Sequence, residues 1–289
     1  MKPLIDCIKK DHPDLKLNSV ALTKENTKQH PEIWKSLDAG EYNIVFATPE
    51  ILLDKRSHFA KQTMRRNTAF RQRLRFITLD EAHLVWDWVR FRRTYTRIGQ
   101  IRAWFPLARF IALSATFPAH VMKYCSQVCK MKGDTRLIVL PGRRSNINVA
   151  VARLPHRKDS IRPLRKLIPD SLKNVTEIEK TLIFVDSIKS AIQITLRLRA
   201  RLKKVLQQVI PEEVIMEPSQ AIQSYFSIID VPTKDATLKE LREGTVRIVV
   251  CTDAMSLGVN IPDITRVIQW AVTKKLHLST LIQRVGRCV

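Results

Sequence analysis

Short apolar runs rich in β-branched residues recur along the chain, with segments of helical periodicity between them. The runs lie at residues 18–22 (NSVAL), 43–48 (NIVFAT), 75–80 (RFITLD), 110–116 (FIALSAT), 181–186 (TLIFVD), 247–253 (RIVVCTD) and 266–270 (RVIQW). Strands that read as continuous apolar runs are typical of a parallel sheet covered by helices on both faces. Helix-like segments at 31–40, 187–206 and 234–244 alternate with the runs. The pattern therefore predicts an α/β fold.

A polar, basic stretch interrupts this alternation at residues 141–160 (PGRRSNINVAVARLPHRKDS). It contains Pro141, Gly142 and Pro155, which are residues that break regular structure. A chain of 289 residues is long enough for two compact domains. We place a domain boundary near residue 145, which gives an N-terminal domain of residues 1–145 and a C-terminal domain of residues 146–289.

The charge balance narrows the class of partner. Lys and Arg number 50 against 27 Asp and Glu, so the formal net charge is +23 and the sequence pI is about 10.2. Such an excess places the compact state under self-repulsion unless a polyanion relieves it. Nucleic acid is therefore the favoured partner and a membrane surface the second choice; the plainer alternative is that the basic residues only solvate the surface. No apolar run approaches the roughly 18 residues of a membrane span, and the first residues have no signal-peptide core.

Cysteine usage gives no sign of a metal or disulfide framework. The five cysteines include no CxxC pair, although Cys125 and Cys129 are four residues apart and could offer two ligands from one helix face. Two thiols without further partners do not make a zinc site. We expect no zinc site in this chain and a reducing, intracellular compartment.

Several predicted strands end on polar or acidic residues: 79–83 (LDEAH), 113–116 (LSAT), 184–187 (FVDS) and 251–260 (CTDAMSLGVN). In open α/β sheets, ligands bind outside the carboxyl ends of the strands, so these tips would line a cleft. Acids beside bound phosphates can hold Mg²⁺ and position a water for attack. On this interpretation Asp80 holds the metal and Glu81 orients or deprotonates the water. An acidic helix cap after a strand is the alternative for this motif taken alone.

The order and spacing of these segments resemble the superfamily 2 helicases. Residues 46–50 (FATPE) look like motif Ib, LDEAH like motif II, 113–117 (LSATF) like motif III, 181–187 (TLIFVDS) like motif IV, 251–263 (CTDAMSLGVNIPD) like motif V and 283–287 (QRVGR) like the start of motif VI. Residues 80–106 are similar to the aromatic-rich loop of the RecQ-like DNA helicases. The resemblance implies two RecA-like parallel-sheet domains in tandem, an ATP-binding domain incomplete at its N-terminus and a C-terminal helicase domain truncated after motif VI.

The resemblance also implies an activity, which is ATP-dependent DNA unwinding in the 3′ to 5′ direction. The expected cofactors are ATP and Mg²⁺, the expected partner is single-stranded or partly duplex DNA, and the expected compartment is the nucleus, with DNA repair and recombination as the processes. ATP would sit between the domains, so that its binding closes them and its hydrolysis opens them. The matching positions are catalytic Asp80 (also the metal ligand), Glu81, Gln283 and Arg287, coupling residues His83, Ser114, Thr116 and Asn260, and nucleic-acid-binding residues Thr48, Pro49, Glu50, Trp88, Phe91, Arg92, Thr252 and Asp253.

Two tryptophans after the acids receive different interpretations. Aromatic faces stack on any base, and arginines pair with phosphates or stack as cations, so Trp88 is assigned to single-stranded DNA. Trp86 has no match in the family pattern and is assigned to packing. Between residues 194 and 206 leucines and arginines alternate, so we do not expect a helix there to separate them cleanly. Each of these arginines is as readily a solvated side chain as a DNA contact.

The largest departure from the family is the phosphate-binding loop. No stretch of the sequence matches GxxxxGK[ST], and residues 2–8 (KPLIDCI) already resemble motif Ia. Losing about four charge-assisted hydrogen bonds forfeits roughly 6 kcal/mol, or about 10⁴-fold in affinity. The family's loop strand lies inside the first sheet, so its neighbours would lack a partner strand. The family usually has other residues at the positions of Asp87, Phe226 and Asn260. It also has a second motif VI arginine that this sequence does not contain.

These departures keep three alternatives open. The first is a RecQ-like DNA helicase represented by an incomplete chain, with negligible ATP hydrolysis by these 289 residues alone. The second is a non-catalytic remnant that binds nucleic acid or nothing. The third is an RNA helicase, because a DEAH sequence occurs in that class as well.

Overall fold

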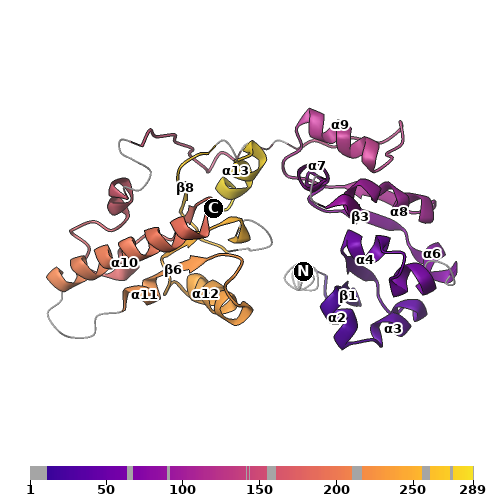
Figure 1. Ribbon diagram of the computed structural model, residues 1–289, viewed down its shortest axis with the longest axis horizontal. Coiled ribbons are helices and arrows are strands. Elements are labelled where there is room, and N and C mark those ends of the chain that lie inside the picture. The colour runs from indigo at the N-terminus through magenta and orange to yellow at the C-terminus, as the bar shows by residue number, and fades with distance from the viewer. Residues whose placement is uncertain are drawn as a thin grey trace. The chain divides into compact units, whose positions relative to one another are not determined.

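The structure is a computed structural model that describes residues 12–63, 68–89, 92–140, 142, 144–154, 161–209, 217–255, 261–273 and 276–288. The chain divides into two compact units, Met1–Pro141 and Gly142–Val289 (Figure 1). The boundary that the sequence places near residue 145 lies close to this division. Each unit has its own hydrophobic core, and each is described separately below.

Unit 1 alternates short strands and helices. Its elements are β1 (Ser19–Leu22), α2 (Lys24–Gln29), α3 (Ile33–Ala39), β2 (Ile44–Ala47), α4 (Pro49–Leu53), the π-helical η1 (Phe59–Thr63), α6 (Thr68–Arg73), β3 (Phe76–Leu79), α7 (Leu84–Trp88), the 3₁₀-helical η2 (Arg93–Arg97), α8 (Gly99–Trp104), β4 (Arg109–Ala112) and α9 (Ala119–Val128). All four apolar runs of this half are strands, as predicted.

The strands of unit 1 form two parallel pairs. In the described residues β1 pairs with β2 and β3 pairs with β4, and each pair is a separate two-stranded sheet. One face of the β3–β4 pair packs on the core, while Phe76 and Ile111 on the other face are exposed. The expectation of burial on both faces is therefore wrong for these two strands.

Unit 2 contains a single sheet and longer helices. Its elements are the 3₁₀-helical η3 (Arg162–Leu167) and η4 (Val175–Glu177), β5 (Thr181–Phe184), α10 (Ile188–Val209), α11 (Pro218–Ala221), β6 (Ile222–Tyr225), α12 (Val231–Glu243), β7 (Ile248–Cys251), the 3₁₀-helical η5 (Asp253–Met255), β8 (Arg266–Gln269) and α13 (Leu278–Val285). The three apolar runs of this half are strands, and β6 is an additional strand that the hydrophobic pattern did not reveal.

The sheet of unit 2 is parallel, with strand order β6-β7-β5-β8. The central strands β5 and β7 are buried along their whole length, as the continuous apolar runs predicted. Alternate residues enter two different cores: Ile183 and Val250 pack with α10, whereas Phe184 and Val249 pack with Leu241 of α12. Helices thus cover both faces, and Figure 1 shows α10 lying across the sheet. The fold class is confirmed as α/β, with parallel strand pairing in both units.

Helix α10 separates its residues more cleanly than the alternating sequence suggested. Leu198, Leu202 and Leu206 follow one another at four-residue intervals, so they lie on one face and are buried in the core. Leu196 is half a turn away and is exposed. The expectation that this helix would not segregate its leucines is therefore wrong for three of the four. No helix among the described residues has both the length and the apolar character needed to cross a membrane.

Candidate functional site

The acidic pair of unit 1 lies at the carboxyl end of the β3–β4 pair. Leu79 is in register with Ala112, so Asp80 and Glu81 emerge beside the segment that follows β4. Two backbone hydrogen bonds fasten these tips together, from Ala82 N–H to the Leu113 carbonyl (2.8 Å) and from Leu113 N–H to the Leu79 carbonyl (2.9 Å). Parallel pairing therefore brings the sequence motifs that resemble motifs II and III to one edge, as predicted.

Glu81 adopts an unusual backbone conformation. Its φ is 49°, in the left-handed region that non-glycine residues rarely occupy. The carboxylate Oδ1 of Asp80 accepts the Glu81 N–H at 2.9 Å and holds this turn. A left-handed residue with a side chain costs about 1–2 kcal/mol. Strain of this kind persists where the surrounding structure enforces it, often at functional sites.

His83 connects the acid to the segment after β4. Its ring is buried, and Nδ1 lies 2.9 Å from Ser114 Oγ and 3.3 Å from Glu81 Oε2. Ser114 Oγ donates its single hydrogen to the Thr116 carbonyl (2.8 Å) and accepts the Thr116 N–H (3.2 Å). Since a hydroxyl has only one hydrogen, Ser114 must accept from His83, so Nδ1 carries the proton. The structure thus joins Glu81, His83, Ser114 and Thr116 in one hydrogen-bonded network.

Thr116 has a further polar atom at this site. The residue is 5% exposed, and its Oγ1 has no hydrogen-bond partner within the described part of the chain. Buried polar atoms are paired in the great majority of cases. The Thr116 hydroxyl is therefore a donor and acceptor that a bound group could satisfy.

Asp80 fits the role of a magnesium ligand that works together with a nucleotide. Its side chain is exposed, and only Oδ1 is engaged by the turn. Mg²⁺ keeps several waters and needs only one or two carboxylates when phosphates complete its shell. No group of three or more His, Cys, Asp or Glu side chains is arranged to hold a metal ion in the regions that the structure describes. The donor set thus suits a magnesium ion that arrives with phosphates.

Three of the predicted nucleic-acid-binding residues pack against one another. Arg92 Cζ lies 4.2 Å from the centre of the Trp88 ring, and Arg92 Nη1 lies 3.9 Å from Glu50 Oε1. The Trp88 ring meets Tyr95 edge to face, with centroids 5.4 Å apart. Burial raises the pKa of Tyr95, Glu50 raises it further, and Arg92 lowers it. This cluster connects α4, which follows β2, to the aromatic-rich segment.

Four other residues of unit 1 were assigned roles from the sequence: Thr48, Pro49, Trp86 and Phe91. Thr48 is exposed at the start of α4, and Pro49 occupies its first turn. Trp86 meets His120 and Tyr124 of α9 edge to face at 5.4 and 5.1 Å, yet it is 40% exposed, whereas Trp88 is half-buried against the core of unit 1. The assignment of Trp86 to the core is therefore wrong. Phe91 lies outside the described residues.

The two cysteines considered as metal ligands belong to the core of unit 1. Cys125 and Cys129 are both buried, and the Cys125 thiol donates to the Ala82 carbonyl at 3.2 Å. Burial raises the pKa of Cys125 to about 11 and that of Cys129 to about 12. Both thiols are therefore protonated at neutral pH, whereas a metal ligand must be a thiolate.

In unit 2 a buried arginine organises the strand tips. Arg284 of α13 is 2% exposed, and its Nε and Nη2 donate to Asp253 Oδ1 at 3.0 and 2.6 Å. Its Nη1 donates to Asp186 Oδ1 at 3.3 Å and to Gln269 Oε1. The guanidinium also lies 5.3 Å from the centre of the Phe184 ring. One side chain therefore ties α13 to the ends of β5, β7 and β8.

The sequence analysis did not identify Arg284, Asp186 or Gln269. The sequence did contain one signal for this network, which is charge complementarity. Aspartates end the segments FVD and CTD, and QRVGR contains an arginine that could pair with them. Asp253, which was assigned to nucleic acid, has one carboxylate oxygen engaged by Arg284. Thr252 precedes Asp253 in the chain, and its N–H donates to the Tyr225 carbonyl at 3.2 Å. Asn260 lies outside the described residues.

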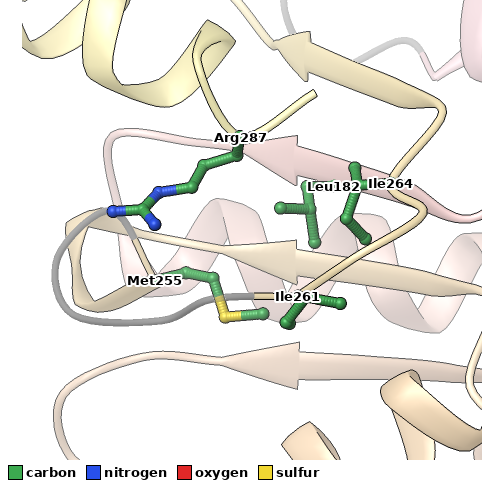
Figure 2. Close-up of a pocket in the computed structure, with 5 residues that line it drawn as sticks. All are labelled: Leu182, Met255, Ile261, Ile264 and Arg287. Carbon is green, nitrogen blue, oxygen red and sulfur yellow. The ribbon is translucent and has the colours of Figure 1, made fainter. Parts of the chain in front are cut away.

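Gln283 and Arg287 lie on either side of Arg284 in the sequence. Gln283 is half-buried on α13, and the Arg287 N–H donates to the Arg284 carbonyl at 3.2 Å just past the helix. Arg287 lines a small pocket with Leu182, Met255, Ile261 and Ile264 (Figure 2). Figure 2 shows its guanidinium directed away from Leu182, Ile261 and Ile264. The other four residues that line this pocket are apolar.

Comparison with protein families identifies both halves of the chain. The family described as "DEAD/DEAH box helicase" matches residues 4–124, and "Helicase conserved C-terminal domain" matches residues 159–289. Among curated relatives, the bifunctional 3'-5' exonuclease/ATP-dependent helicase WRN of Mus musculus is 24% identical over 99% of this chain. The ATP-dependent DNA helicase Q1 of Pongo abelii is 24% identical over 91% of it. The chain spans 19% and 37% of the lengths of these two relatives.

Solved structures with the same fold bind either kind of nucleic acid. The DUF1998 helicase MrfA bound to DNA and AMPPNP has a TM-score of 0.68 at 17% identity. The aligned region covers 100% of this chain and 39% of the MrfA chain. Mss116p bound to ssRNA and AMP-PNP has a TM-score of 0.68 at 20% identity. The aligned region covers 99% of this chain and 53% of the Mss116p chain. At these identities the likeness establishes the fold alone.

Proposed function

We propose that this chain, which belongs to the superfamily 2 helicases, is the motor region of an ATP-dependent DNA helicase of RecQ type. The observation that carries the proposal is the network at the tip of β3, where His83 bridges Glu81 and Ser114. A motor must relay the state of its nucleotide to other parts of the chain. A buried histidine that contacts both the catalytic acid and the next strand tip supplies such a relay.

The proposed chemistry uses the unit 1 acids in distinct roles. Asp80 would hold a magnesium ion, which when bound offsets the negative charge of the phosphates. Glu81 would accept a hydrogen bond from the attacking water and orient it. His83 Nδ1–H would hold the Glu81 carboxylate in place from 3.3 Å. By resemblance, Gln283 and Arg287 of α13 would contact the nucleotide, with Arg287 stabilising charge on the transferred phosphoryl group.

The choice of DNA over RNA rests on the aromatic-rich segment. Trp88, Arg92 and Glu50 form one cluster, so a base stacked on Trp88 would disturb the Arg92 contact with Glu50 on α4. In this way, binding of a single strand at Trp88 would change the side-chain contacts of α4, the helix that follows β2. RecQ-type proteins carry such a segment, and the relative named ATP-dependent DNA helicase Q1 supports this interpretation.

Binding of single strands tests this choice. We expect the 289-residue chain to bind single-stranded DNA more tightly than RNA of the same sequence. Trp88→Ala should weaken DNA binding about 5- to 100-fold, because base stacking contributes about 1–3 kcal/mol. The measurement is fluorescence anisotropy at one fixed salt concentration, with Trp86→Ala, two residues away on α7, as the matched control. Tighter binding to RNA, or equal loss in both variants, would contradict the proposal.

ATP turnover by the isolated chain gives a second test. The sequence contains no GxxxxGK[ST] loop to hold the β- and γ-phosphates, so we expect negligible hydrolysis with or without DNA. The measurement is phosphate release in the presence of magnesium and single-stranded DNA. DNA-stimulated release that Glu81→Gln abolishes would show that the chain holds ATP by other groups. It would also show that Glu81 has the proposed role.

A further inference from the structure

The turn that follows α13 is held by a residue 142 positions earlier in the chain. Arg144 Nη1 donates to the Gly286 carbonyl at 2.9 Å. Gly286 is the C-cap residue of α13, and Arg287 follows it directly. Arg144 and Gly286 both belong to unit 2, so this contact lies within one compact unit.

The contact completes the cap of α13. The last carbonyls of a helix have no partner inside the helix and need donors from elsewhere. Backbone N–H groups just past α13 supply three donors, which run from Gly286 to Ile282 (2.8 Å), from Arg287 to Arg284 (3.2 Å) and from Cys288 to Val285 (3.0 Å). The Gly286 carbonyl is next in the series, and its donor is the Arg144 guanidinium. A cation at this end of a helix also interacts favourably with the helix dipole.

Arg287 is tethered on its other side as well. The Cys288 thiol donates to the Thr265 carbonyl at 3.3 Å, and Thr265 directly precedes β8. Arg287 therefore lies between a tether on Gly286 and a tether on Cys288. Tethers on both neighbours restrict the backbone of Arg287, and the backbone conformation limits the rotamers that its side chain can adopt.

From these contacts we infer that Arg144 is a positioning residue for Arg287. The inference rests on the proposed function only for the role of Arg287, which is to stabilise charge on the transferred phosphoryl group. Arg144 acts through the Gly286 carbonyl and not through the nucleotide itself. Unit 2 begins at Gly142, two residues before Arg144, so the segment that enters unit 2 sets the direction of the Arg287 side chain.

The plainer interpretation of an exposed arginine is a contact with nucleic acid. Arg144 is exposed, so a phosphate could reach it. The positioning role is favoured because the guanidinium already donates to a carbonyl that a helix end leaves without an internal partner. The two roles differ in one measurable respect: only the positioning role makes Arg287 respond when Arg144 is replaced.

The Nε–H signal of Arg287 in nuclear magnetic resonance reports on this response directly. We expect Arg144→Ala to shift or broaden this signal, which Arg287→Lys identifies by its loss. Arg144→Lys keeps a cation that can donate to the Gly286 carbonyl, so it should restore most of the wild-type signal. Arg153→Ala is the matched control, at an exposed arginine further along the same segment, and should leave the signal unchanged.

Thiol modification measures the release of the same turn. Cys288 is half-buried, whereas the other three cysteines among the described residues are buried, and Cys7→Ser removes the fifth thiol. We expect Arg144→Ala to raise the modification rate at Cys288 about 2- to 10-fold, which is the contribution of one hydrogen bond to keeping the turn closed. A pH series separates this opening, which raises the rate at every pH, from a change in thiolate fraction, which moves the profile along the pH axis.

Both measurements need neither ATP nor nucleic acid, so their failure is distinguishable from failure of the proposed function. An unchanged Arg287 signal in Arg144→Ala, or an equal change in Arg153→Ala, would overturn the inference. An unchanged rate at Cys288 would do the same. Weaker binding of single-stranded DNA by Arg144→Ala with an unchanged Arg287 signal would assign Arg144 to nucleic acid instead. Circular dichroism verifies that every variant is folded.

Discussion

At the scale of single residues, Arg284 carries the strongest prediction about stability. Its guanidinium is almost fully buried and serves Asp253, Asp186 and Gln269 together. The carboxylates that it binds are more accessible, with the Asp253 side chain 65% and the Asp186 side chain 29% exposed, so the loss is smaller than for a fully buried pair. Hydrogen bonds to charged groups contribute about 1.5–3 kcal/mol, and we therefore expect Arg284→Met to lower the free energy of unfolding of unit 2 by about 2 kcal/mol, measured by urea unfolding.

The control for this prediction is an exposed pair of the same chemistry. Arg266 Nη2 lies 2.5 Å from Glu179 Oε2, but the two side chains are 42% and 53% exposed. Exposed pairs contribute about 0–1 kcal/mol. Arg266→Met should accordingly lower the free energy of unfolding by less than about 1 kcal/mol. Similar losses in both variants would show that Arg284 does not organise the strand tips.

At the scale of elements, α12 has a cap whose strength depends on pH. Asp230 accepts the Thr233 N–H at 2.9 Å and the Thr233 hydroxyl at 2.8 Å, and Gly244 ends the helix with a φ of 87°. The Thr233 hydrogen bonds lower the pKa of Asp230. A carboxyl with a depressed folded-state pKa stabilises the fold above its unfolded pKa of about 4. That stabilisation is lost as the pH falls through the lower, folded-state value.

Substitutions at this cap separate the hydrogen bond from the charge. Asp230→Ala should lower the melting temperature of unit 2 by a few degrees at neutral pH, because two donors lose their acceptor. Asp230→Asn keeps an acceptor and should retain most of the stability, with a weaker loss below pH 4. Thermal melts between pH 3 and pH 7 measure both effects. Identical pH profiles for the wild type and Asp230→Asn would contradict the assignment.

The strands show which elements the sequence could predict. All seven apolar runs are strands, although only β5 and β7 are buried along their whole length, so the apolar, β-branched composition identified the strands better than it identified their burial. The missed strand, β6, has polar residues at its centre. Gln223 bonds to Thr237 and Glu240 of α12, and Ser224 to Thr195 of α10. These partners lie 14–29 residues away, so no local pattern could reveal that the strand's polar groups are satisfied.

The candidate site was predictable to a different extent in each unit. Motif order placed Asp80, Glu81, His83, Ser114 and Thr116 together, and parallel pairing of β3 and β4 does bring them to one edge. The Arg284 network was missed because its partners come from three separate segments whose pairing is set by the strand order β7-β5-β8. Strand order is a property of tertiary packing, and the spacing of motifs does not encode it.

At the scale of the whole molecule, the two units should differ in stability. Among the residues that the structure describes, unit 1 has two separate two-stranded sheets, and the β3–β4 pair has an exposed face, whereas unit 2 has one four-stranded sheet with cores on both faces. A two-stranded sheet is marginally stable, and apolar burial is the main driving force for folding. We expect urea to unfold unit 1 first, in two transitions rather than one.

Tryptophan fluorescence assigns each transition to a unit. Trp34, Trp86, Trp88 and Trp104 belong to unit 1, and the fifth tryptophan, Trp270, is buried in the core of unit 2. The first transition should therefore carry most of the fluorescence change, and Trp270→Phe should remove the fluorescence change of the second. A single transition that coincides by fluorescence and circular dichroism would mean that the units unfold together.

The left-handed turn at Glu81 restricts how this position can change over evolutionary time. Asparagine, aspartate and glycine tolerate such a turn, yet each is too short to reach where the glutamate carboxylate ends. Glutamine reaches as far but brings no charge. Each of these replacements therefore gives up tolerance of the left-handed turn, side-chain length or charge, and glutamate is the residue that keeps both the length and the charge.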